Sequence, residues 1–345
     1  VGKRNRFLIR IKNDEKADSR PFIRAGIIWK GSHFLLVRDA NGMSRFMKMK
    51  NKREESLTHT GLLFLLPSAV LCFVFVLLPL MNVVYYSMTE WNGVSKVKKF
   101  VGFSNYLNLP KMDGFRDMIV ATFTFAIGVT LLTVIVSFAV ALALEREGKG
   151  RLPRGMMRAL WFFPALLSGV VVGVLWRIMY NYHNGMINAV LQVFHLKPVN
   201  WLETVGITNI AVIVGNTWVQ VGLCFVIFLA GLQSIPVELY EAARIDGATS
   251  FQQLCHITFP LMAVSITINM VTTTIAAFRA YELPYLISQG LPGKTTLLMT
   301  QRIYFFGFQT REFGMGSALS VVLTIIIGLI SLIQLYVLKR REDVF

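Results

Sequence analysis

The sequence predicts an all-α integral membrane protein, and this prediction rests on its composition and on where its charges lie. Of the 345 residues, 54% are hydrophobic and only 16% are charged, whereas soluble domains contain about 25% charged residues. The net charge of +16 would by itself favour a nucleic-acid partner. However, 15 of the 35 basic residues fall within residues 1–58. We therefore expect a basic tail over 1–58, a membrane domain over 59–345 and no nucleic-acid partner.

Six charge-poor segments are long enough to cross a membrane. A spanning helix needs about 20 mostly apolar residues to cross a hydrocarbon core of about 30 Å. The predicted transmembrane helices cover residues 61–86, 119–143, 157–178, 208–232, 260–283 and 315–338. A further charge-free stretch, 178–196, carries too many polar side chains to span lipid. We expect there only a short interfacial helix over 186–194.

The basic residues orient these six helices. The tail, the connections 144–158 and 233–259 and the C-terminal end hold 24 basic residues, against 9 in the connections on the opposite side. Basic residues accumulate in cytoplasmic connections. We expect a multi-pass protein of a bacterial-type plasma membrane, with both termini in the cytoplasm.

The N-terminal tail leaves two interpretations open. The chain begins with Val1, residues 1–42 have no clear periodicity, and Met43, Met47 and Met49 precede the first predicted helix. In one interpretation the natural protein starts near these methionines and 1–42 is foreign to it. In the other, the whole of 1–58 is a cytoplasmic tail. The basic residues outside 1–42 favour the same orientation in both.

The residues give no pattern typical of catalysis or of metal binding. The three cysteines and five histidines are scattered, without the spacing of metal ligands or of a disulfide framework. Residues 288–295 end in Gly-Lys-Thr, but Ser288 stands where a phosphate-binding loop needs its first glycine. We expect a turn on Gly290, Pro292 and Gly293 there. The chain is expected to be no enzyme and to bind neither cofactor nor metal.

The connection over 234–260, between the fourth and fifth predicted helices, reads as two short helices joined by a tight turn. Pro236 suits the first turn of a helix, and Gly247 suits a left-handed helix terminator. Ser250 and Gln253 form a capping-box pattern for the second helix. One face of the first helix carries Leu239, Ala242, Ala243 and Asp246. We expect a rigid cytoplasmic elbow suited to transmitting motion from a partner; an ordinary interfacial helix pair is the alternative.

The same residues resemble the EAA motif of permease subunits of binding-protein-dependent ABC importers. The motif is carried by Glu241-Ala242-Ala243, then Asp246-Gly247-Ala248, then Ile257-x-Phe259-Pro260. Its Ile-Asp-Gly-Ala form is similar to the carbohydrate-importer group, which includes maltose and sn-glycerol-phosphate permeases, although Phe259 stands where that group usually has Leu. Further segments resemble the family in order, including 101–106, 185–188, 201–202, 230–236 and 290–296. The resemblance covers about 59–345.

The resemblance implies a type I ABC importer permease fold, in which the elbow is a coupling helix that docks on a separate ATPase. It also implies the partners: a second permease subunit in a heterodimer, two ATPase subunits that use ATP and Mg, an extracellular solute-binding protein, a carbohydrate substrate and membrane lipid. This chain would hydrolyse nothing itself. The coupling residues implied are Glu241, Ala242, Ala243, Asp246 and Gly247.

The fifth predicted helix is the most polar of the six and is the candidate for the translocation pathway. Its hydroxyl and amide groups suit a sugar, whose own hydroxyls need replacement hydrogen bonds. The alternative is that these groups form hydrogen bonds between helices, which use the same residue types. For Arg279 and Glu282 the alternative is a structural salt bridge, or charged ends that snorkel to the membrane boundary. The candidates are Asn269, Thr272, Thr273, Arg279, Tyr281 and Glu282.

Two other classes of protein stay open. One is an ion-coupled carrier, which usually holds titratable carboxylates near the membrane midplane. No acidic residue lies deep in a predicted helix, which disfavours that class. The other is a membrane scaffold that transports nothing.

Overall fold

The computed structural model describes residues 26–30, 33–37, 64–146, 154–290 and 296–342. The chain divides into two units, Val1–Leu78 and Pro79–Phe345. In the first unit, β1 (Gly26–Lys30) pairs antiparallel with β2 (His33–Val37), an element that the sequence did not predict. The remainder of the 1–58 tail, with the three methionines that precede the first predicted helix, lies outside the described residues.

In the part of the chain that the structure describes, four apolar helices are continuous and long enough to cross a membrane: Phe64–Ser87, Phe115–Glu145, Ile207–Gln233 and Phe313–Leu338. They confirm the helices predicted over 61–86, 119–143, 208–232 and 315–338. The first contains a π-helical turn, η1 (Phe73–Leu77), and ends as α2 (Leu78–Ser87). The other three belong to α4 (Phe115–Arg146), α8 (Ile207–Gln233) and α15 (Phe313–Glu342). The 27 residues of α8 rise about 40 Å, more than the hydrocarbon core requires.

The third predicted helix, 157–178, is not straight. It is built from α5 (Arg154–Phe162), the 3₁₀ turn η3 (Phe163–Leu166) and α6 (Gly169–Met179), with a 97° bend between the two halves. Pro164 has no amide proton to continue the helix. Leu167 and Ser168 then have extended backbones. Hydropathy responds to side chains and not to these backbone angles, so it predicted a span here without indicating the bend.

The fifth predicted helix, 260–283, is also bent. The chain passes through α10 (Ser250–Gln253), the π turn η4 (Leu254–Thr258) and α11 (Phe259–Leu261) before α12 (Ala263–Phe278). The two parts meet at 66°. The described residues therefore contain four continuous candidate spans, and up to six when each bent pair is counted as one.

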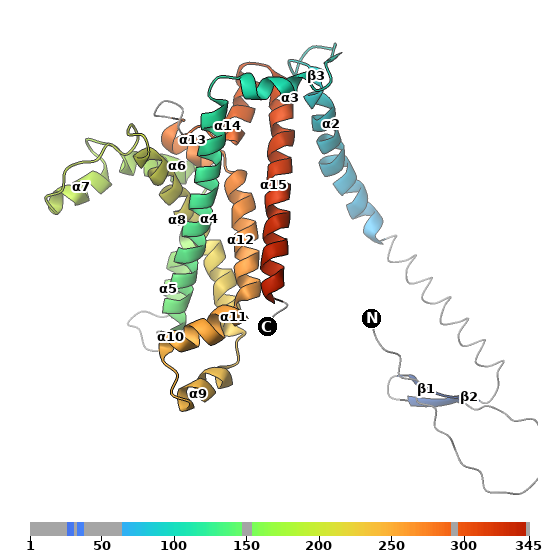
Figure 1. Cartoon of the computed structure of the whole chain (residues 1–345), viewed down its shortest axis with the longest axis vertical. Helices are drawn as coiled ribbons and strands as arrows, with labels where there is room; N and C mark the ends of the chain where they lie inside the picture. Colours follow the sequence, from blue (N-terminus) through green and yellow to red (C-terminus); the bar gives the residue numbers. More distant parts are fainter. Residues whose placement is uncertain (1–25, 31–32, 38–63, 147–153, 291–295, 343–345) are drawn as a thin grey trace, which may run out of the picture. The chain divides into compact units, whose positions relative to one another are not determined.

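The second unit is a bundle in which α4, α8, α12 and α15 pack side by side (Figure 1). One cluster of buried side chains joins these helices to α6, and it includes Phe125, Val129, Val172, Ala211, Ala277 and Leu319. A second cluster lies closer to α9 and includes Ala141, Phe225, Phe228, Leu232 and Met262. The bundle thus fixes the ends of the helices from which the predicted elbow extends.

Glycine allows α5 to approach α8 closely. A β-carbon added to Gly222 of α8 would lie 2.9 Å from the backbone oxygen of Trp161 and 3.2 Å from the α-carbon of Phe162. Real β-carbons do not come that close to a backbone oxygen, so a side chain at 222 would push the two helices apart. Small residues serve this purpose at helix contacts in membranes.

The connections at the other end of the bundle are fixed by asparagine side chains. The short helix predicted over 186–194 is confirmed as α7 (Met186–Val193). Buried Asn188 donates to the carbonyl oxygens of Tyr182 and Val199, and its own oxygen accepts from the Trp201 indole at 2.9 Å. Asn105 donates to the carbonyl oxygens of Ser87 and Thr89. Both asparagines belong to the segments 101–106 and 185–188, which carry part of the resemblance described above.

Short elements complete this end: β3 (Thr89–Glu90), β4 (Lys99–Phe100), α3 (Ser104–Asn108), η2 (Leu109–Lys111), α13 (Glu282–Ser288), α14 (Met299–Tyr304) and η5 (Phe305–Gln309). Gly290 has a φ of +81°, as the predicted turn requires. The other two residues of that prediction, Pro292 and Gly293, lie outside the described residues.

Candidate functional site

The predicted elbow is present as a helix that stands off the bundle. It begins with α9 (Val237–Ile245), which is separated from the end of α8 by three residues, and continues into α10. Figure 1 shows α9 and α10 together at one end of the bundle. Pro236 is the residue that precedes α9, and Glu238 lies in its first turn, where the helix dipole favours a carboxylate.

Gly247 ends α9 in a Schellman motif. Its φ is +78°, a conformation that residues with a β-carbon rarely adopt. The amide of Gly247 donates to the carbonyl oxygen of Arg244 at 3.1 Å, and the amide of Ala248 donates to that of Ala243 at 2.8 Å. These are the two hydrogen bonds that define the motif. The predicted role of Gly247 as a left-handed terminator is confirmed.

The capping box that starts α10 lies one residue earlier than predicted. The N-cap is Thr249, whose amide donates to the side-chain oxygen of Gln252 at 2.7 Å, while the amide of Gln252 donates to the Thr249 hydroxyl at 3.3 Å. The prediction of Ser250 and Gln253 was wrong because both pairs have the same types and spacing. The Schellman turn decides between them, since it leaves Thr249 with the extended backbone that an N-cap needs.

One side-chain hydrogen bond connects α9 directly to the bent fifth span. The hydroxyl groups of Tyr240 and Thr258 lie 2.9 Å apart, and Thr258 is the last residue of η4. Beside this contact is a cavity of about 540 Å³ whose lining includes Glu145 of α4, Gln233 of α8 and Arg244 of α9. Among the described residues, α9 is therefore held by its two chain connections and by this bond, and not by close packing on the bundle.

The candidate coupling residues lie together at one turn of the elbow. Glu241, Ala242, Asp246 and Gly247 are exposed and Ala243 is half-buried. Two apolar residues near them are also exposed, Ile245 at 87% and Phe251 at 72%. Neither residue was predicted from the sequence, although an isoleucine outside the apolar face of α9 could have indicated this exposed position.

The candidate pathway residues of α12 take part in helix packing. Asn269 is fully buried and donates to the carbonyl oxygen of Cys224 in α8 at 3.2 Å. Thr273 lies 3.2 Å from the sulfur of the same cysteine. Thr272 is exposed, and its hydroxyl donates to the carbonyl oxygen of Ile268. These contacts favour the interhelical interpretation for Asn269 and Thr273, whereas Thr272 faces outward.

A third polar contact in the bundle involves residues outside the six predicted candidates. The hydroxyl of Thr274 accepts from the amide of Gln334 in α15 at 2.9 Å and from the hydroxyl of Thr130 in α4 at 3.4 Å. One α12 side chain therefore joins three helices. Its partners are far away in the sequence, so no local pattern could have indicated them.

The other candidates lie past the end of α12, away from Asn269. Arg279 is exposed, and within the described residues it forms no ion pair with Glu282. The Glu282 carboxylate instead lies against Gly169, the first residue of α6, where the helix dipole favours negative charge. Tyr281 stacks on Tyr285 at 5.7 Å between ring centroids and lies 5.0 Å from Tyr304. The six candidates thus divide into a buried group and an end group.

Among the described residues, no group of three or more His, Cys, Asp or Glu side chains is arranged to hold a metal ion. Cys72 and Cys255 are exposed and Cys224 is buried, and all three are free thiols. The candidate site is therefore the exposed helix α9, which the chain connects to α8 and to the bent span that contains α12.

Most of the chain matches one known protein family. Residues 60–343 match the family described as "Binding-protein-dependent transport system inner membrane component". Because this match covers most of the chain, the chain belongs to that family, and it is a membrane permease with the type I permease fold.

Two similar relatives illustrate the family. The trehalose/maltose transport system permease protein MalF of Thermococcus litoralis is 31% identical, over 82% of this chain and 95% of the relative. The multiple sugar-binding transport system permease protein MsmF of Streptococcus mutans is 30% identical, over 82% of this chain and 96% of the relative.

Solved structures support the fold alone. A chain of a bacterial ABC transporter involved in the import of the acidic polysaccharide alginate matches with a TM-score of 0.70 and 21% identity, covering 85% of this chain and 99% of that chain. The same kind of transporter, in complex with a periplasmic protein that holds an alginate pentasaccharide, matches with a TM-score of 0.71 and 20% identity.

Proposed function

We propose that this chain is the permease subunit of an ATP-driven importer of carbohydrates, forming half of the translocation pathway. Family membership supports the transport role, and the sugar-transport relatives support the substrate class. The observation that carries the proposal is the exposed elbow. Its helix α9 is closed by Gly247 and bonded through Tyr240 to the bent fifth span, so a force on α9 reaches the bundle.

The elbow is the coupling element in this proposal. Glu241, Ala242, Ala243, Asp246 and Gly247 contact an ATPase subunit, with the small alanines allowing close approach and Gly247 fixing the turn. ATP and Mg belong to two ATPase subunits, and this chain catalyses no reaction. A second permease completes the pathway in a heterodimer, and an extracellular binding protein delivers the substrate.

The pathway assignment follows the exposure of the candidates. Thr272, Arg279, Tyr281 and Glu282 are not enclosed by neighbouring helices, and these are the side chains that we propose for contact with substrate. Asn269 and Thr273 have a positioning role, because they hold α12 against α8. The tyrosine cluster at the end of α12 suits a sugar ring, because sugar rings have an apolar face that stacks on aromatic side chains.

Reconstitution in vesicles tests the function. The chain and its partner permease are incorporated with or without the ATPase subunits, and uptake of labelled oligosaccharides is measured. We expect flux only when ATP, the ATPase and the binding protein are all present. Flux driven by an ion gradient without ATP would identify a secondary carrier instead, and no flux in any combination would favour a scaffold.

A further inference from the structure

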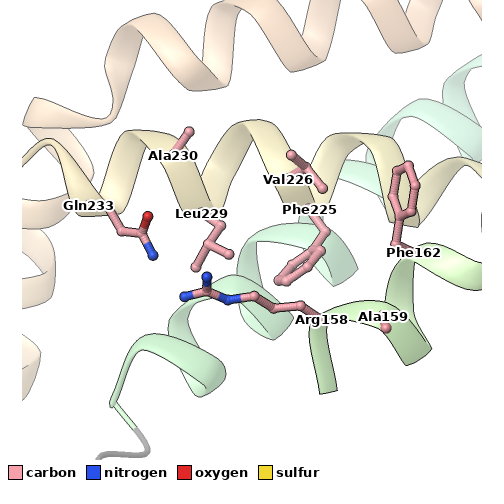
Figure 2. Close-up of a pocket in the computed structure, with 8 residues that line it drawn as sticks. All are labelled: Arg158, Ala159, Phe162, Phe225, Val226, Leu229, Ala230 and Gln233. Carbon is pink, nitrogen blue, oxygen red and sulfur yellow. The ribbon is translucent and has the colours of Figure 1, made fainter. Parts of the chain in front are cut away.

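A second cavity lies beside the elbow and belongs to neither the coupling residues nor the candidate pathway. It has a volume of about 380 Å³ and is formed by α5 and the last third of α8 (Figure 2). Gln233, the last residue of α8, lies at one end of it, and α9 begins four residues later. The cavity is therefore at the end of the bundle that carries the elbow.

The cavity has an apolar wall and a polar end. The wall includes Phe162 of α5 and Phe225, Val226 and Leu229 of α8. Phe225 and Leu229 are buried in the bundle, whereas Val226 is 45% exposed at the rim. In Figure 2 the Arg158 side chain extends along α8 toward the end where Gln233 projects. Cavities with mostly apolar walls and a few polar groups are typical of ligand sites.

Arg158 and Gln233 have free hydrogen-bonding capacity. Over the described part of the chain, neither the guanidinium of Arg158 nor the side-chain amide of Gln233 makes a hydrogen bond or ion pair. A guanidinium is always charged and presents a fork of donors that matches the oxygens of a phosphate. The described residues that line this cavity include no acid. Glu145 lines the adjoining cavity under α9, and Gln233 lines both cavities.

This combination matches an anionic amphiphile better than a sugar. A sugar would leave most of its hydroxyls without partners against the Phe and Leu wall, which is costly. A phospholipid places its phosphate at the membrane boundary and its chains along apolar side chains. Basic pockets between helices on the cytoplasmic side bind such headgroups.

We propose that this cavity binds an anionic glycerophospholipid of the cytoplasmic leaflet. The phosphate lies on Arg158, the amide of Gln233 donates to a headgroup oxygen, and an acyl chain follows Phe162, Val226 and Leu229. The lipid bridges α5 and the end of α8 directly before the elbow, and so stiffens the base on which α9 moves. The assignment of this end to the cytoplasm rests on the proposed function.

Native mass spectrometry tests the binding without requiring transport. The complete chain, purified in detergent with the subunits that accompany it, is titrated with dioleoylphosphatidylglycerol, dioleoylphosphatidylcholine or inorganic phosphate. We expect preferential retention of phosphatidylglycerol. Arg158→Gln should weaken that retention about tenfold, as expected for loss of one charge-assisted contact, and Arg158→Lys should preserve most of it.

Arg177→Gln is the matched control, because Arg177 is an exposed arginine near the far end of the same bent span. It should retain phosphatidylglycerol like the unchanged chain. Equal retention by Arg158→Gln, or equal retention of the two lipids, overturns the proposal. Displacement of the lipid by millimolar inorganic phosphate identifies a free-anion site, and displacement by an acidic oligosaccharide identifies a substrate site; either result also overturns it.

A flux measurement separates this proposal from the proposed function. In vesicles containing phosphatidylglycerol, we expect faster ATP-driven uptake than in pure phosphatidylcholine, and Arg158→Gln should abolish the difference. If the uptake rate does not depend on lipid composition although the chain still retains phosphatidylglycerol, the proposed stiffening of the base of α9 is overturned. Absence of uptake in every vesicle contradicts the proposed function and leaves the lipid result standing.

Discussion

Gly247 is the residue at which the conformation of the elbow depends on a single backbone angle. We predict that Gly247→Pro abolishes uptake while membrane insertion is retained. Proline fixes φ near −65° and has no amide proton, so it can adopt neither the +78° at this position nor the hydrogen bond to Arg244. Uptake and the amount of membrane-inserted protein are measured together.

Gly247→Ala is the graded control for that experiment. Nothing lies within 4 Å of a β-carbon added at this position, so alanine meets only the left-handed penalty of about 1–2 kcal/mol. Uptake should fall less than with proline. Normal uptake in the proline variant would contradict the assignment of the elbow as the coupling element.

Asn269 is the second residue with a prediction of its own. The side-chain amide of Asn269 donates to the backbone of Cys224 inside the bundle. Asn269→Ala should therefore lower the free energy of unfolding by about 1 kcal/mol and leave the order of substrate preference unchanged. Thr272→Ala, at an exposed position three residues along, should keep stability and alter that ranking. A changed ranking in Asn269→Ala would place this side chain in the pathway.

At the scale of elements, the Tyr240 and Thr258 hydroxyl groups join α9 to the bent fifth span. We predict that Tyr240→Phe reduces the coupling of ATP hydrolysis to uptake, so that more ATP is consumed for each sugar imported. The change removes a hydrogen bond worth about 1 kcal/mol and keeps the ring. Thr258→Val should have the same effect, and the double variant should add little to either. Additive effects would show that the two hydroxyls act separately.

The contact between α5 and α8 carries the second element-scale prediction. Gly222→Ala forces a methyl group against the backbone of Trp161, and overpacking of this kind costs about 1–3 kcal/mol. We expect a lower unfolding temperature of the purified protein. Gly155→Ala is the matched control, since Gly155 lies in α5 with open space around it. Equal stability of the two variants would contradict the close approach.

At the scale of the whole molecule, the orientation in the membrane can be read from the chain's own cysteine. Cys255 is exposed in η4, within the elbow segment 234–260. In a Cys72→Ser background, a membrane-impermeant maleimide should label it only after the cells are permeabilised. Val97→Cys, at a position 78% exposed between β3 and β4, should be labelled in intact cells. The reverse pattern would invert the predicted topology.

Much of this architecture could be predicted because it depends on local properties. Four continuous helices follow from runs of apolar side chains, and the end of α9 follows from a glycine at the only position where the turn needs one. The bends before α6 and α12 were not predicted, because hydropathy reports composition and not backbone angles. The capping box was misplaced because Thr249 and Ser250 offer equivalent patterns, and only the preceding turn distinguishes them.

The contacts between distant segments could not be predicted at all. Thr274 bonds to side chains from two other helices, and Glu282 lies on the start of α6. Each of these pairings depends on how whole helices pack. Residue types in α12 showed that polar groups needed partners, but the partners became known only with the structure.

The two bent spans have a consequence for how the protein is made. Helix α6 has 11 residues and α12 has 16, so each rises only about 17–24 Å, less than the thickness of the hydrocarbon core. Peptide groups at the breaks cannot face lipid without protein partners. We therefore expect the segment 154–179 to be stably inserted only after the synthesis of α8, which packs on α5 and η3.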